Sequence, residues 1–165
     1  ANIVRGWFAQ ASGDYNAFIK ALLNDDTEAM NAYMNRVSQR IFSTFDVGKK
    51  PSEQSEPERF YHGFVLGLMV ELIDQYEVKS NRESGFGRYD VVLKPRDIRK
   101  KAMILEFKVF NPNKETVLED TVKNALKQIK EKNYAAELLE AGIVKENIKM
   151  YGFAFKGKKI LICGE

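Results

Sequence analysis

The chain has 165 residues, which is enough for one domain and a short extension but not for two full domains. Its composition, 44% hydrophobic and 30% charged, excludes a disordered or fibrous chain and predicts a folded protein with a substantial core. The net charge of +3 permits a nucleic-acid partner but does not require one.

Cysteine and histidine are almost absent from the chain, which contains only Cys163 and His62. This excludes an internal disulfide, a zinc site built from cysteines and a metal site with several histidines. Any metal must therefore be bound by carboxylates. No apolar run approaches the roughly 20 residues that span a bilayer, and the first residues do not resemble a secretory signal. We expect a cytoplasmic protein with no membrane association.

Two helices are predicted in the first third of the chain. Residues 15–23 and 28–45 carry apolar side chains at intervals of three and four, which is typical of a helix with one packed face. Asp14 and Thr27 are the expected N-terminal caps. We interpret both apolar stripes as packing surfaces.

A polar segment with two prolines, residues 48–57, predicts a linker. It would separate an N-terminal helical segment, residues 1–47, from a second domain, residues 57–165. The pattern of that domain predicts helices at 58–75 and 117–141, the second ending at Gly142, and strands at 76–81, 88–94, 102–110, 148–155 and 159–163. This order indicates an α/β fold with a mixed central sheet flanked by helices, preceded by a helical pair.

The predicted strand at 102–110 contains two opposite charges within an apolar run. Because side chains alternate along a strand, Glu106 and Lys108 point to one face of the sheet. Burying them is unfavourable unless each has a partner. A divalent cation bound by oxygen ligands is one such partner for the carboxylate, and the lysine could then activate a water or stabilise charge on a phosphate.

A second carboxylate is available from the preceding predicted strand. Asp90 is the only acid of that strand and follows a Gly-Phe-Gly turn at 85–87. In an antiparallel pair of strands it would lie on the same face as Glu106. Two carboxylates and a lysine at one edge of a sheet indicate a site that hydrolyses phosphodiester bonds.

Asp90 followed by the Glu106-Phe107-Lys108 tripeptide resembles the D…(D/E)xK signature of the PD-(D/E)XK nuclease superfamily. Segments 58–62, 80–90, 104–109, 125–134 and 151–155 are similar to nuclease domains that follow an AAA-ATPase-like domain in many bacterial and some archaeal proteins. The resemblance implies a restriction-endonuclease-like core over residues 57–163. It also implies an ATPase-like domain in the same longer chain.

The resemblance further implies individual roles. Metal ligands would be Asp90, Glu106, the backbone carbonyl of Phe107, and Glu58 of the first helix, with Mg²⁺ or Mn²⁺ as the expected cofactor. Lys108 would be the catalytic lysine, and Gln128 would lie near the active site. Residues that could contact nucleic acid are Arg82, Arg88, Lys132 and Tyr134.

Two kinds of function remain open from the sequence. The leading hypothesis is a metal-dependent nuclease, with DNA as a more favoured substrate than RNA. The alternative is a catalytically silent nuclease-like module that binds nucleic acid or regulates an ATPase-like partner. In a third interpretation, a plain interaction module, the charges of Glu106 and Lys108 would pair for structural reasons only.

Overall fold

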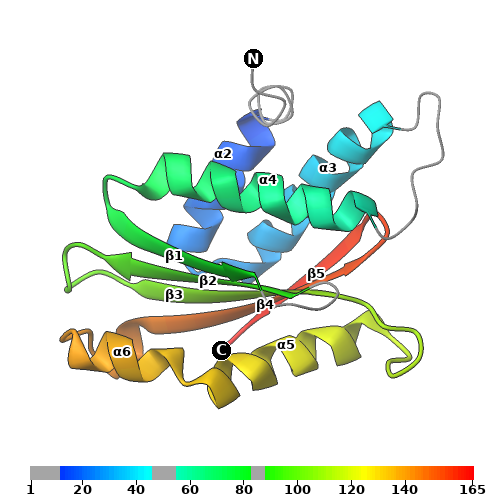
Figure 1. The fold of residues 1–165 in the computed structure, drawn as a ribbon. Coiled ribbons are helices and arrows are strands. Elements are labelled where there is room, and N and C mark those ends of the chain that lie inside the picture. Colours follow the sequence, from blue (N-terminus) through cyan, green and yellow to red (C-terminus); the bar gives the residue numbers. More distant parts are fainter. Residues whose placement is uncertain (1–11, 46–54, 83–87) are drawn as a thin grey trace.

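The computed structural model describes residues 12–45, 55–82 and 88–165, without the side chains of 12, 41–45, 55–62, 82 and 88. A five-stranded sheet lies between two helical layers (Figure 1). Helices α2, α3 and α4 cover one face of the sheet, and α5 and α6 cover the other. This arrangement confirms the predicted α/β fold with a mixed sheet flanked by helices.

The elements follow one another in the predicted order. They are α2 (Ser12–Leu23), α3 (Thr27–Phe45), α4 (Ser55–Leu72), β1 (Tyr76–Arg82), β2 (Arg88–Pro95), β3 (Ala102–Val109), α5 (Leu118–Lys132), α6 (Tyr134–Glu140), a 3-10 turn (Lys145–Asn147), β4 (Ile148–Lys156) and β5 (Lys159–Gly164). The strands are ordered β1-β2-β3-β4-β5 across the sheet. Among the described strands, β3 and β4 alone pair in parallel, because α5 and α6 carry the chain back between them.

Alternation along the strands divides the core in two. On one face, Leu105, Phe107 and Phe153 of the sheet pack with α2, α3 and α4 through a cluster of aromatic rings that includes Phe18 and Phe64. The other face is a smaller cluster between the sheet and the helices α5 and α6. The N-terminal helices therefore share a hydrophobic core with the sheet.

The helix starts differ in detail from the sequence-based prediction. Helix α2 begins at Ser12, so Asp14 lies in its first turn rather than at its cap, and it pairs with Arg36 of α3 at 3.4 Å. The Asp26 carboxylate, not Thr27, accepts the hydrogen bond from the Ala29 N–H at the start of α3.

Residues 55–57 are helical rather than part of a linker, since a proline is well tolerated in a first helical turn. The predicted turn at 85–87 lies outside the described residues.

The prediction of one long helix at 117–141 is wrong in one respect, because the structure has two helices there. Asn133 separates α5 from α6 and adopts the left-handed conformation, with a φ of 55°. Asparagine is one of the few side chains that tolerates this conformation. Gly142 has a φ of 98°, as expected of a residue that follows the end of a helix.

The edge strand β5 is paired with side chains of α3. The Asn31 side chain donates to the Ile162 carbonyl at 2.8 Å and accepts from the Ile162 N–H at 2.8 Å. One turn further along the helix, Asn35 makes the same two contacts with Ile160. These two asparagines satisfy backbone groups that a further strand would otherwise satisfy.

Candidate active site

Asp90 and Glu106 are directly opposite each other in the antiparallel pair of β2 and β3. Both side chains point toward α5, because the residues on either side of them belong to the opposite core cluster. They are 1% and 0% exposed. The structure thus confirms the predicted juxtaposition of these two carboxylates and shows that it is buried.

Lys132 and Tyr134 approach the carboxylate pair from the helical layer. The Lys132 Nζ donates to Asp90 Oδ2 at 2.6 Å and lies 3.5 Å from Glu106 Oε1. The Tyr134 hydroxyl donates to the same Asp90 oxygen at 2.8 Å. The sequence suggested both residues as nucleic-acid contacts, and the structure places them against the carboxylates.

The break at Asn133 explains how both side chains reach one oxygen atom. Residues two positions apart on a continuous helix point in very different directions. Lys132 is the last residue of α5 and Tyr134 is the first residue of α6, and the left-handed Asn133 between them redirects the chain. The local irregularity is therefore what assembles this side of the site.

The two carboxylates differ in their affinity for protons. Burial raises the pKa of Glu106 well above its ordinary value, and the neighbouring Asp90 carboxylate makes a smaller contribution in the same direction. Burial also raises the pKa of Asp90, but the neighbouring Glu106 together with Lys132 and Tyr134 outweighs it and holds that pKa below the usual range. The pKa values of the two neighbouring carboxyl groups are therefore shifted in opposite directions.

Lys108 has a partner that the sequence did not suggest. Its Nζ lies 3.0 Å from Glu115 Oε2, in the loop between β3 and α5. Glu115 is buried and also accepts hydrogen bonds from the Asn111 N–H, the Thr121 hydroxyl and the Asn124 side-chain amide, at 2.7 to 3.0 Å. A single glutamate therefore fixes the lysine, the loop and the first turns of α5.

Burial alone would raise the pKa of Glu115. The hydrogen bonds that it accepts from Asn111, Asn124, Lys108 and Thr121 have the larger, opposite effect, so its pKa lies below the ordinary value. Glu115 accordingly stays ionised beside the lysine. No pattern in the sequence singled out Glu115, since it lies in an irregular polar segment.

Helix α5 lies unusually close to the sheet beside Glu106. Gly152 of β4 is the register partner of Glu106, and a Cβ atom there would lie 3.0 Å from the Val122 carbonyl oxygen and 3.3 Å from the Ala125 Cβ. The missing side chain permits this close approach. It brings the helix that carries Gln128 and Lys132 onto the carboxylate face of the sheet.

The remaining predicted residues are placed as follows. Gln128 is on α5, and its buried Oε1 has no hydrogen-bond partner within the described part of the chain. Phe107 lies between Glu106 and Lys108 on β3, with its side chain in the core of the opposite face. Glu58 belongs to α4, a helix of the opposite layer, and its side chain lies outside the description, as do the side chains of Arg82, Arg88 and His62.

The donor set of the carboxylate pair fits a hard divalent cation. Asp90 Oδ1 and both Glu106 oxygens are buried without a hydrogen-bond partner among the residues that the structure describes. Unpartnered buried carboxylate oxygens are unfavourable in a protein unless a cation binds them. Mg²⁺ commonly uses only one or two protein carboxylates and fills its other positions with water and phosphate oxygens. Over the described ranges, no group of three or more acidic, histidine or cysteine side chains is available to hold a metal.

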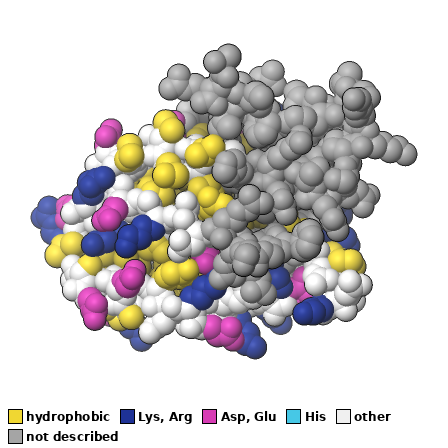
Figure 2. Space-filling view, in the orientation of Figure 1, with side chains coloured by type: hydrophobic (Ala, Val, Ile, Leu, Met, Phe, Trp, Pro, Cys, Tyr) yellow, Lys and Arg dark blue, Asp and Glu magenta, His cyan; other side chains and the backbone are white. Residues whose placement is uncertain are grey.

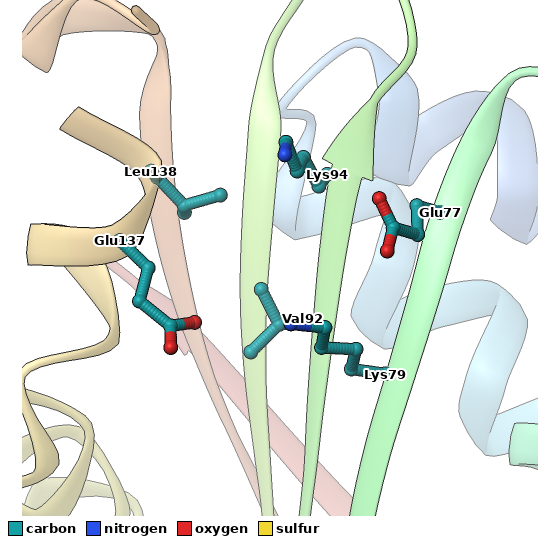
Figure 3. A pocket seen from close by; sticks show the side chains of 6 residues that line it. All are labelled: Glu77, Lys79, Val92, Lys94, Glu137 and Leu138. Atoms are coloured by element: carbon teal, nitrogen blue, oxygen red, sulfur yellow. The ribbon is translucent and has the colours of Figure 1, made fainter. Parts of the chain in front are cut away.

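A small pocket of about 110 Å³ lies further along the same face (Figure 3). Val92, two residues after Asp90, forms part of its floor, and Leu138 of α6 faces it from the other side. Two lysines and two glutamates complete the lining: Glu77, Lys79, Lys94 and Glu137. Its charges balance, so the pocket does not favour an anion over a cation.

The surface seen in Figure 2 carries charges of both signs. Basic and acidic side chains alternate over the described lower part of the molecule, and apolar side chains lie between them. On this face the described residues form no extended basic patch of the kind that binds the nucleic-acid backbone non-specifically. No helix of the described residues is both long and apolar enough to cross a membrane.

A comparison with known families decides the classification. The family model of the PD-(D/E)XK nuclease superfamily matches residues 56–165, which is more than half of the chain. The chain belongs to this superfamily. Searches of curated proteins and of solved structures gave no match. The matched segment includes every strand, α5, α6 and nearly all of α4.

Membership in the PD-(D/E)XK superfamily confirms the predicted fold and identifies residues 56–165 as a nuclease-like domain. Members of this superfamily are generally nucleases that use divalent metals. The carboxylate pair of β2 and β3 lies within the matched segment.

Proposed function

We propose that this protein is a Mg²⁺- or Mn²⁺-dependent nuclease that hydrolyses phosphodiester bonds, with DNA favoured over RNA. The observation that supports it most is the cross-strand pair of Asp90 and Glu106, which is buried and has three carboxylate oxygens without a hydrogen-bond partner among the described residues. Such a pair is unfavourable unless enough positive charge lies beside it, and a divalent cation would add to the single charge of Lys132.

Asp90 and Glu106 would hold the metal, and the Phe107 carbonyl and Glu58 are proposed as further ligands. A bound divalent cation supplies Lewis-acid stabilisation of the phosphate and lowers the pKa of a bound water. Lys108 would stabilise the negative charge that develops on the phosphate, and Glu115 would hold its ammonium group. Gln128, with its buried side-chain oxygen, is proposed to orient water or substrate.

An AAA-ATPase-like domain in the same longer chain is proposed as the partner. Helices α2 and α3, which precede the matched segment and pack on the sheet, would form the connection to it. Nucleic acid is the proposed substrate, with Arg82 and Arg88 as contacts beside the carboxylates, since they flank the same hairpin.

The test is cleavage of supercoiled, linear and single-stranded DNA and of RNA by the wild type, Asp90→Asn and Glu106→Gln, with Mg²⁺, Mn²⁺ or EDTA. Metal-dependent cleavage that both substitutions abolish is expected. Asp97→Asn is the matched control, because Asp97 lies half-buried in the turn between the same two strands and its side chain bonds only to Arg99 among the contacts described. If the wild type binds Mn²⁺ but cuts none of the substrates, the silent module described above is the better account.

A further inference from the structure

Lys132 is in contact with both carboxylates of the site. Its ammonium group lies 2.6 Å from Asp90 Oδ2 and 3.5 Å from Glu106 Oε1, and only 22% of its side chain is exposed. The other lysines of α5 with a described ion pair behave differently. Lys127 and Lys130 are 72% and 57% exposed and pair with acids at the surface.

Two buried carboxylates side by side repel each other strongly, because little solvent is present to screen them. A positive charge near both of them reduces this repulsion. Lys132 is the cation that the described structure places there, and Tyr134 adds a neutral donor to the same Asp90 oxygen. The lysine thus supplies in the metal-free protein the positive charge that a divalent ion would supply in the loaded one.

We propose that Lys132 is an internal counter-ion of the Asp90 and Glu106 pair and competes with the divalent cation for it. The lysine stabilises the metal-free fold, and metal binding has to overcome its attraction to the carboxylates. The competition rests on the metal-binding function proposed above, whereas the stabilisation of the metal-free fold does not.

The position of Lys132 supports an exchange of this kind. It is the last residue of α5, next to the left-handed Asn133, and its long side chain reaches the carboxylates from the rim of the site. A flexible four-carbon chain can withdraw its ammonium group toward solvent without a change in the backbone. Asp90 Oδ1 and Glu106 Oε2, in contrast, have no described contact with the lysine and stay available to a second cation.

The experiment compares the wild type with Lys132→Met, which keeps the aliphatic length and removes the charge. Lys127→Met is the matched control on the same helix, since Lys127 pairs only weakly with Glu131, at 3.9 Å. Thermal unfolding is measured in EDTA and in Mn²⁺, and Mn²⁺ affinity is measured by calorimetry. Neither readout depends on nuclease activity.

Lys132→Met is expected to lower the melting temperature in EDTA and to recover most of the loss in Mn²⁺. Its Mn²⁺ affinity should rise by roughly tenfold, because a neighbouring positive charge no longer opposes the ion. In an Asp90→Asn background the same substitution should have a much smaller effect on melting in EDTA, as in a double-mutant cycle of two groups in contact. If Lys132→Met does not fold, Lys132→Arg is the second variant. Because it retains the charge, its melting temperature in EDTA should resemble that of the wild type.

Several outcomes would overturn the proposal. The proposed competition would be refuted if Lys132→Met bound Mn²⁺ no more tightly than Lys127→Met, or more weakly than the wild type. An unchanged melting temperature in EDTA would remove the counter-ion role. If neither the wild type nor Lys132→Met binds Mn²⁺, the metal-dependent function fails as well, and the calorimetry of the wild type distinguishes that case from the others.

Discussion

Glu115 holds the ammonium group of Lys108 at 3.0 Å, although the two residues belong to a loop and a strand and are seven positions apart. Three further donors, from Asn111, Thr121 and Asn124, bind the same carboxylate. The lysine next to the proposed metal site is therefore anchored through the loop and the N-terminal turns of α5, which makes the position of its charge dependent on a residue outside the superfamily signature.

Glu115→Gln is predicted to destabilise the protein by about 3 kcal/mol, because it leaves Lys108 half-buried without its counter-charge. The effect should depend on pH. The pKa of Glu115 is held below its ordinary value, so its contribution is present above about pH 4.3 and is lost as the pH falls through the lower folded-state pKa. Thermal unfolding of both proteins between about pH 3 and pH 8 would measure this.

The difference between wild type and Glu115→Gln should be largest near neutral pH and shrink in acid. Glu119→Gln, an exposed glutamate in the first turn of α5, is the control and should change little. A constant difference at every pH would mean that the carboxylate charge of Glu115 contributes nothing.

Gly152→Ala is predicted to force α5 away from the sheet. The added Cβ would lie 3.0 Å from the Val122 carbonyl oxygen, which cannot move without the helix backbone. We expect a loss of about 1 to 3 kcal/mol in the free energy of unfolding, measured by urea denaturation. Gly13→Ala is the control, since a Cβ there meets no atom within 4 Å. Equal stability of Gly152→Ala and the wild type would show that the helix tolerates the displacement.

Asn133→Ala is predicted to lower stability by about 1 kcal/mol, because alanine tolerates a positive φ less well than asparagine does. Asn133→Gly should match the wild type or exceed it, since glycine adopts this conformation without strain. Urea denaturation of the three proteins separates these expectations. If alanine and glycine behaved alike, the left-handed conformation would not be what position 133 requires.

Tyr134→Phe is predicted to lower the free energy of unfolding by about 1 kcal/mol. Asp90 Oδ2 loses one of its two described hydrogen-bond donors, while the other donor, Lys132, remains. The measurement is thermal unfolding in EDTA. Tyr33→Phe is a suitable control, since the described contact of Tyr33 is through its ring, with the Arg36 guanidinium above it. A larger loss for Tyr33→Phe than for Tyr134→Phe would contradict the prediction.

The sheet and the carboxylate pair were predictable because both depend on simple periodicities. Alternation along a strand places Glu106 on one face, and a short hairpin places Asp90 opposite it. Both ends of each predicted strand agree with the structure to within one residue. The parallel pairing of β3 with β4 gives the mixed sheet that the element order indicated.

The partners of these charges were not predictable for physical reasons. The apolar pattern runs on through Asn133, so it indicated one helix, and in one helix Lys132 and Tyr134 could not meet at a single oxygen. A single residue in the left-handed conformation changes this. Glu115 lies in an irregular loop, where no period relates a side chain to the sheet.

The hydrogen bonds from Asn31 and Asn35 to β5 bear on where the folding unit begins. A fragment that started at the boundary of the family match, residue 56, would lack α3 and would present the N–H and C=O groups of Ile160 and Ile162 as an open strand. Open strands of this kind recruit other chains and promote self-association. The hydrogen bonds of Asn31 and Asn35 therefore protect the outer edge of β5 from pairing with other chains, and we expect a fragment limited to the superfamily match to self-associate more readily than a chain that includes α3.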